Sequence, residues 1–99
     1  MDELQQLRDK IDSIDRQMAA LFEQRMHCVN RISRVKVRLG LPVRDPEREA
    51  AMAENGLRYI SDETLHPLYA RFLSGLTSLS REYQETLRDR SGEPFPKPE

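Results

Sequence analysis

The chain is short and highly charged: of its 99 residues, 37% are hydrophobic and 33% are charged, and the formal net charge is -1. This length excludes a second domain, and the balanced charge argues against binding to nucleic acid or to an anionic membrane surface. A domain this small and polar has little apolar surface for a core of its own, so we expect association between chains.

The numbers of cysteines and histidines limit the disulfides and metal sites that the chain can form. The chain has one cysteine, Cys28, and two histidines, His27 and His66. A single cysteine excludes an intrachain disulfide, and the two histidines lack the spacing of zinc ligands, so we expect no metal and no cofactor. We expect Cys28 to be buried and both histidines to lie at the surface. The acidic N-terminus lacks an apolar run, which predicts a cytoplasmic protein without a secretory signal or a membrane span.

The first 39 residues predict one long helix. Neither Gly nor Pro occurs from Asp2 to Leu39, and apolar residues recur at alternating spacings of three and four. These seam residues occupy the a and d positions of a heptad: Leu4, Leu7, Ile11, Ile14, Met18, Leu21, Cys28, Ile32, Val35 and Leu39. Such a helix is ~57 Å long, whereas a compact domain of this size has a radius of gyration of ~13 Å, so the helix must protrude. A second copy of the chain is the simplest cover for this seam.

Two further helices are expected after a break. Gly40 ends the first helix, and residues 41–43 form an extended link, because the residue before a proline avoids the helical region. Asp45 and Pro46 then provide the N-cap and the first residue of a short helix, which ends near Gly56 or a few residues later.

The third predicted helix follows cap candidates at residues 61–63 and runs to about Arg88 or Arg90. Its apolar residues again alternate between spacings of four and three: Leu65, Tyr69, Phe72, Leu76, Leu79 and Tyr83. Residues 91–99 contain three prolines and predict a disordered tail or the stub of a linker, which leaves residues 1–90 as the domain.

Cations interrupt and border the seam. Arg25 occupies a seam position, where a charged side chain must be paired, reach water or meet a ligand. Lys36 borders the same stripe about 16 Å further along the axis and nearly three whole turns away, so the two side chains can grip one small molecule. Arg8 lies about 25 Å from Arg25 and would reach that site only from an antiparallel partner helix, which predicts two equivalent sites per dimer.

Polar residues of the other helices complete a candidate pocket. Ser80 and Gln84 lie one turn apart on one face of the third helix, and Arg48 and Glu49 follow the cap residue Asp45. Together with the cations of the first helix, these groups suit a small dianion that also carries a hydroxyl. The set holds no nucleophile with a neighbouring base, so its chemistry should proceed by positioning and electrostatics.

Each feature also has a purely structural interpretation. An arginine in a heptad seam can pair with a glutamate of a partner helix, and a cation beside a seam commonly covers apolar surface with its stem. Asp45 is a helix cap whatever else it does, and Glu49 can form a surface pair with Arg48 or Arg44. Arg44 is in turn a candidate to fix the second helix through an acidic residue.

With these residues in place, the sequence resembles the all-helical class of chorismate mutases over about residues 4 to 88. The resemblance rests on the pairs Leu7-Arg8 and Ile14-Asp15, on Arg25 and Lys36, on the segment Pro42-Val43-Arg44-Asp45-Pro46-Glu47-Arg48-Glu49, and on Ser80 and Gln84. It implies an all-α fold in which three helices per chain, one long, one short and one medium, intertwine as a homodimer with antiparallel long helices.

The resemblance also implies a reaction, the rearrangement of chorismate to prephenate on the way to phenylalanine and tyrosine. Arg25 and the partner's Arg8 would bind the two substrate carboxylates, with assistance from Ser80. Lys36 and Gln84 would donate to the ether oxygen, which gains negative charge as its bond to carbon breaks.

The second helix would contribute the remaining contacts. By the same resemblance, Glu49, with the groups around Asp45 and Arg48, would orient the ring hydroxyl of the substrate. Holding the enolpyruvyl arm over the ring would supply the rest of the rate enhancement.

Other functions stay open at this point. Isochorismate-pyruvate lyases and mutases of amino-substituted chorismate use the same scaffold, although the Arg-Asp-x-x-Arg-Glu motif favours chorismate itself. A helical dimer with a regulatory or protein-binding role, and without turnover, is the alternative of a different class. Many family members are fused to another pathway enzyme, so a fused or separate partner enzyme is a further open alternative.

Overall fold

Three helices make up most of the chain. The computed structural model describes residues 2–90, and the predicted tail at residues 91–99 lies outside the described residues. Helix α1 spans Glu3–Leu39, α2 spans Pro46–Arg58 and α3 spans His66–Asp89. No strand occurs within residues 2–90, which confirms the predicted all-α fold. None of the helices described there has the length and apolarity that a bilayer-spanning segment requires.

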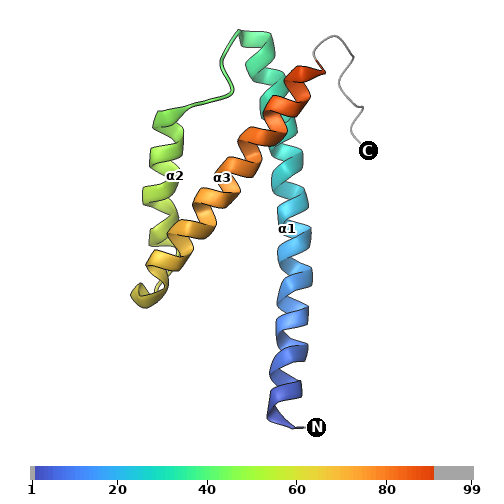
Figure 1. Cartoon of the computed structure of the whole chain (residues 1–99), viewed down its shortest axis with the longest axis vertical. Helices are drawn as coiled ribbons and strands as arrows, with labels where there is room; N and C mark the ends of the chain where they lie inside the picture. Colours follow the sequence, from blue (N-terminus) through green and yellow to red (C-terminus); the bar gives the residue numbers. More distant parts are fainter. Residues whose placement is uncertain (1, 91–99) are drawn as a thin grey trace.

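Helix α1 ends at the residue that the sequence predicted, and it begins directly after Asp2. Asp2 is the N-cap and accepts a hydrogen bond from the Gln5 backbone at 2.7 Å. Gly40 ends the helix in the left-handed region at φ 70°, which glycine adopts without a steric penalty. The N-terminal part of α1 extends well beyond α2 and α3 (Figure 1), and the molecule is 55 Å long with a radius of gyration of 17.1 Å. The predicted protrusion is therefore confirmed.

The short helix α2 also has its predicted cap. The Asp45 side chain accepts a hydrogen bond from the Arg48 backbone at 3.1 Å, and Pro46 occupies the first turn. Because its missing N–H is not needed there, proline at this position costs no hydrogen bond. The helix then runs to Arg58 and packs beside α3 (Figure 1).

The start of α3 differs from the prediction. Asp62 caps a short 3-10 turn, Glu63–Leu65, by accepting hydrogen bonds from the Thr64 backbone at 3.0 Å and the Thr64 hydroxyl at 2.6 Å, and these bonds lower the pKa of Asp62. Helix α3 begins only after this turn, at His66. His66 is half-buried, with Nε2 2.7 Å from the Ile60 carbonyl, so its predicted surface position was wrong; His27 is exposed as predicted.

The single chain has almost no core. Among the described residues, the buried hydrophobic side chains are Val29 of α1 and Leu87 of α3, on the faces where the two helices meet. The seam of α1 remains exposed, and Cys28, predicted to be buried, is exposed with it. A second stripe of exposed apolar residues runs from the 3-10 turn along α3: Leu65, Leu68, Phe72 and Leu79.

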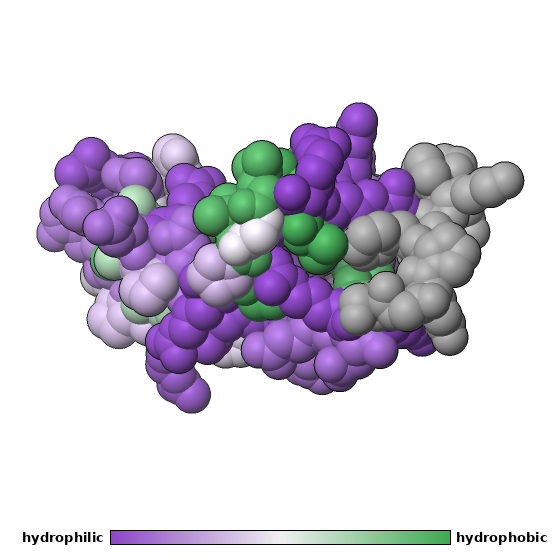
Figure 2. Space-filling view, turned by 90° about the horizontal axis from the view of Figure 1, so that it is seen from above, coloured by the Kyte–Doolittle hydropathy of each residue, from purple (hydrophilic) through white to green (hydrophobic). Residues whose placement is uncertain are grey.

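Apolar residues are also exposed where α1 meets the link to α2. Figure 2 looks onto this end of the molecule and shows hydrophobic residues gathered between hydrophilic ones. Val37, Leu41 and Pro42 line a hollow of about 440 Å³, and Arg88 of α3 donates a hydrogen bond to the Leu41 carbonyl there. This bond joins the end of α3 to the end of α1.

The contact between α2 and α3 depends on the absence of a side chain at Gly56. A Cβ at this buried glycine would lie 2.4 Å from Leu73 Cδ1. We expect Gly56→Ala to lower the free energy of unfolding by about 1 kcal/mol, because the overpacking penalty exceeds the gain in helix propensity. Denaturant unfolding at one protein concentration measures this, with Asn55→Ala at the exposed neighbour as control. A Gly56→Ala protein as stable as the control would contradict the packing argument.

Candidate active site

Arg25 and Ser80 form the first polar contact between α1 and α3. Nη1 of Arg25 donates to the Ser80 hydroxyl at 2.5 Å, and that hydroxyl donates to the Leu76 carbonyl at 2.9 Å. Ser80 is buried and Arg25 is half-buried. Since the serine proton is committed to Leu76, the hydroxyl presents a lone pair to the guanidinium and fixes its position.

The Arg25 guanidinium is in a positively charged, partly desolvated environment. Burial lowers the pKa of Arg25 below its ordinary value, and repulsion by Arg48 of α2 lowers it further, whereas Tyr69 raises it. Arginine nevertheless stays charged at neutral pH. The cations of α1 and α2 therefore favour an anion beside Arg25.

Lys36 and Gln84 form another polar contact between α1 and α3. The Lys36 ammonium donates to the Val43 carbonyl at 2.7 Å and to Oε1 of Gln84 at 3.1 Å. An ammonium has three N–H donors, so one remains for another acceptor. Because Oε1 of the buried Gln84 faces the ammonium, its NH₂ group is turned the other way as a donor. The pair thus offers two kinds of N–H donor close together.

Helix α2 contributes a carboxylate held between two arginines. Oε2 of Glu49 lies 3.5 Å from Nε of Arg44, and Oε1 lies 3.3 Å from Nε of Arg81. The predicted pairing of Arg44 with an acidic residue is thus present. Arg81 was not singled out from the sequence, although its place directly after Ser80 on α3 was a signal that it borders the same site.

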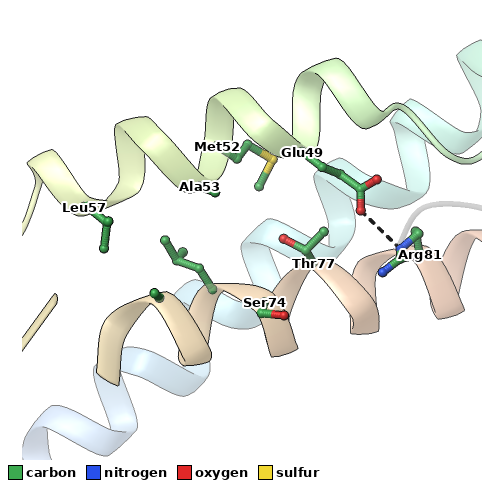
Figure 3. Close-up of a pocket in the computed structure, with 9 residues that line it drawn as sticks. Glu49, Met52, Ala53, Leu57, Ser74, Thr77 and Arg81 are labelled. Atoms are coloured by element: carbon green, nitrogen blue, oxygen red, sulfur yellow. Dashed lines mark ion pairs between the residues drawn. The ribbon is translucent and has the colours of Figure 1, made fainter. Parts of the chain in front are cut away.

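A mostly apolar hollow lies next to this ion pair. It has a volume of about 260 Å³ between α2 and α3, and Met52, Leu57 and Leu73 are among its lining residues. Figure 3 shows Glu49 of α2 reaching toward Arg81 of α3 at one end of the hollow. The charged residues therefore adjoin a surface suited to an apolar part of a ligand.

The structure brings some of the predicted site residues into direct contact and leaves others exposed. Direct hydrogen bonds join Arg25 to Ser80 and Lys36 to Gln84. Asp45 and Arg48 are exposed at the start of α2, and the Asp45 carboxylate is engaged in capping. Within residues 2–90, no three His, Cys, Asp or Glu side chains are placed to hold a metal ion.

Arg8 does not join these residues within one chain. It is exposed in the N-terminal part of α1, which extends beyond α3 (Figure 1). That Arg8 reaches a site only from a partner chain stays a prediction.

A known protein family matches most of this chain. The family model described as Chorismate mutase type II matches residues 7–85. The chain belongs to this family. Family membership confirms the resemblance drawn from the Arg-Asp-x-x-Arg-Glu motif. The matched region covers all of α2, and all of α1 and α3 except the start of α1 and the end of α3.

Several curated relatives are similar to parts of this chorismate mutase family member. The T-protein of Haemophilus influenzae is 44% identical over 54 residues, which is 54% of this chain and 14% of the relative. The Bifunctional chorismate mutase/prephenate dehydratase of Aquifex aeolicus is 32% identical over 90 residues, which is 83% of this chain and 25% of the relative. The Chorismate mutase of Methanocaldococcus jannaschii is 37% identical over 49 residues, half of each chain.

The match covers only part of each of these relatives, from 14% of the T-protein to 50% of the Methanocaldococcus enzyme. No solved structure matches the chain.

Proposed function

We propose that this chain is a chorismate mutase, which rearranges chorismate to prephenate for the biosynthesis of phenylalanine and tyrosine in the cytoplasm. The observation that carries the proposal is the contact between the Lys36 ammonium and the Gln84 amide, 3.1 Å apart, in a member of the chorismate mutase type II family. The Arg25–Ser80 contact between the same two helices supports a carboxylate-binding role beside this donor pair.

The donor pair accounts for catalysis without a nucleophile. The ether oxygen of chorismate gains negative charge as its bond to carbon breaks, so a donor at that oxygen binds the transition state more tightly than the substrate. The remaining ammonium N–H of Lys36 and the NH₂ group of Gln84 are the proposed donors. Since α1 and α3 hold both side chains before substrate arrives, little reorganisation is needed during the reaction.

The remaining groups restrain the substrate. In our proposal Arg25 binds one carboxylate with the help of Ser80, and the partner's Arg8 binds the other. Glu49, with the groups around Asp45 and Arg48, orients the ring hydroxyl. Fixing both ends of the molecule restricts the enolpyruvyl arm to the folded geometry in which the new carbon–carbon bond forms.

A homodimer with antiparallel α1 helices is part of the proposal. Its support is the exposed seam of a helix that extends beyond the rest of its own chain: Leu7 is 52% exposed, Ile11 55% and Leu21 62%. An exposed apolar stripe of this size indicates an interface with another protein surface. In a dimer whose antiparallel α1 helices are related by a twofold axis, Arg8 of each chain would lie near Arg25 of the other. Two equivalent sites per dimer follow.

Among the candidate substrates, we favour chorismate for one reason. The chain retains the Arg-Asp-x-x-Arg-Glu motif, and the resemblance assigns the glutamate of this motif, Glu49, to the ring hydroxyl of chorismate. Turnover of isochorismate with release of pyruvate, or turnover of an amino-substituted chorismate, would move the assignment to another enzyme of this scaffold. The relative with a bifunctional name supports a further part of the proposal, that this chain acts with a fused or separate pathway enzyme.

Growth of a bacterium that lacks chorismate mutase tests the proposed function. We expect expression of the chain to restore growth without added phenylalanine and tyrosine, and expression of a Lys36→Ala variant at the same level to fail. Failure of the wild-type chain, with the dimer present at a normal level, would favour a binding or regulatory role instead.

Activity is expected to depend little on pH near neutrality. Gln84 is neutral at any pH, and the Arg25 guanidinium stays charged at neutral pH. We therefore expect kcat to change by less than about twofold between about pH 6 and 8, as measured by initial rates at saturating chorismate. A steep fall within that range would show that a group titrating near neutrality is required.

A further inference from the structure

We propose that Arg81 is a positioning residue that holds the Glu49 carboxylate in place for the ring hydroxyl of the substrate. The inference rests on the proposed function, since it assigns to Glu49 a substrate to orient. Arg81 lies on α3, and Figure 3 shows it facing Glu49 across the gap between α2 and α3.

The surroundings of Glu49 make Arg81 its principal restraint. Both arginines lie at similar distances from the carboxylate, 3.3 Å for Arg81 and 3.5 Å for Arg44. The Arg44 side chain is 67% exposed, however, whereas that of Arg81 is 30% exposed. Water screens an exposed ion pair and leaves it little net strength, so the pair with Arg81 is the stronger of the two. Arg81 is also fixed within a helix, whereas Arg44 lies in the link before α2.

The ion pair connects α2 to the part of α3 that holds the other site residues. Arg81 directly follows Ser80, which accepts from Arg25, and precedes by three residues Gln84, which accepts from Lys36. The Arg81–Glu49 pair therefore sets the position of the α2 carboxylate relative to the groups proposed to bind the carboxylates and the ether oxygen.

Glu49 retains the capacity to bind a hydroxyl while it is paired. A carboxylate has about four acceptor positions, and two ion pairs leave some of them unused. Oε2 of Glu49 is buried and, apart from its ion pair with Arg44, makes no hydrogen bond among the described residues. A buried acceptor of this kind calls for a donor, and the ring hydroxyl of chorismate is a donor of suitable size.

The pair also limits the local excess of positive charge. Burial lowers the pKa of Arg25, and repulsion by Arg48 lowers it further, so two cations already lie close together at this site. The Glu49 carboxylate beside Arg81 offsets the positive charge of that guanidinium on α3. The attraction between their opposite charges thus keeps Glu49 and Arg81 together at this site.

A double-mutant cycle tests the inference. We expect Arg81→Met to lower kcat/KM for chorismate by about ten- to hundredfold in the otherwise wild-type chain, because Glu49 loses its position. In a Glu49→Gln background the same change should cost less than about twofold, because Arg81 then has no carboxylate to hold. Arg81→Lys, which keeps a positive charge within reach of Glu49, should recover part of the loss.

The matched control is Arg58→Met on the same helix as Glu49. It removes the exposed Arg58–Glu54 ion pair of 3.2 Å and should leave kcat/KM unchanged. Thermal melts show that each variant is folded, and Arg81→Lys extends the test if Arg81→Met unfolds. Equal losses in both backgrounds would overturn the positioning role. An inactive wild-type chain would instead overturn the proposed function, so the two failures are distinguishable.

Discussion

Replacement of Lys36 by alanine is expected to lower kcat by about 10²- to 10³-fold. Removing a single fixed donor from a developing oxyanion has an effect of this size in other enzymes. Lys36 donates to both Val43 and Gln84, so its loss removes one proposed donor to the ether oxygen and releases the other from its partner. Initial rates at saturating chorismate measure the effect.

The control for this substitution is Lys10→Ala, an exposed lysine on the same helix. We expect its kcat to equal that of the wild-type chain. Lys36 also donates to Val43 in the link before α2, so its replacement can affect folding as well as catalysis. Circular dichroism melts show whether the variant is folded. A folded Lys36→Ala protein that keeps a third or more of the wild-type kcat would contradict the proposed role of the ammonium.

Mixing two inactive variants is expected to restore activity. In the proposed dimer, each site takes Arg25 from one chain and Arg8 from the partner. Arg8→Ala and Arg25→Ala homodimers should each lose most of their activity, because one substrate carboxylate is left without its arginine. In a mixed dimer, one of the two sites contains both arginines, so an equal mixture should regain up to about a quarter of the wild-type sites.

This result can be interpreted only if the two variants are shown to exchange subunits. Native mass spectrometry of differently tagged chains measures the fraction of mixed dimers, and each homodimer alone provides the background rate. Activity that rises in proportion to the mixed dimers supports a shared site. No recovery, despite complete exchange, would contradict the antiparallel arrangement of α1 and the role of Arg8.

The local features of the fold could be predicted from the sequence. The heptad and the absence of Gly and Pro predicted α1, and Gly40, Asp45 and Pro46 marked its end and the start of α2. The 3-10 turn before α3 was missed. Asp62 provides the same N-cap signal for a 3-10 turn as for an α-helix, so the sequence did not distinguish them.

Burial was predicted less well, because it depends on the assembly. Cys28 lies on the α1 seam and is exposed in the single chain, although a heptad position of this kind is buried in a helical dimer. His66 lies at a helix start, where a surface residue was expected, and instead contacts the Ile60 carbonyl. That contact depends on the path of the chain between α2 and α3, which the helix periodicities do not specify.

The site required information beyond spacing. Helical geometry placed Arg25 and Lys36 on one side of α1, but the partners of these residues lie on α3, whose register against α1 is a property of tertiary packing. Ser80 and Gln84 were identified by their spacing on the third helix, and the resemblance gave them roles; the structure joins both to α1. Arg81 lies outside that motif, and its importance became visible only when α2 brought Glu49 beside it.

The reaction itself provides the most direct test of the central claim. The loss of chorismate absorbance is followed after addition of the purified chain, and the product is identified by mass spectrometry after chromatographic separation from chorismate. We predict steady enzymatic loss of chorismate with prephenate as the product and no release of pyruvate. A folded chain that leaves chorismate at its uncatalysed rate of decay would contradict the assignment of this helical site to the rearrangement.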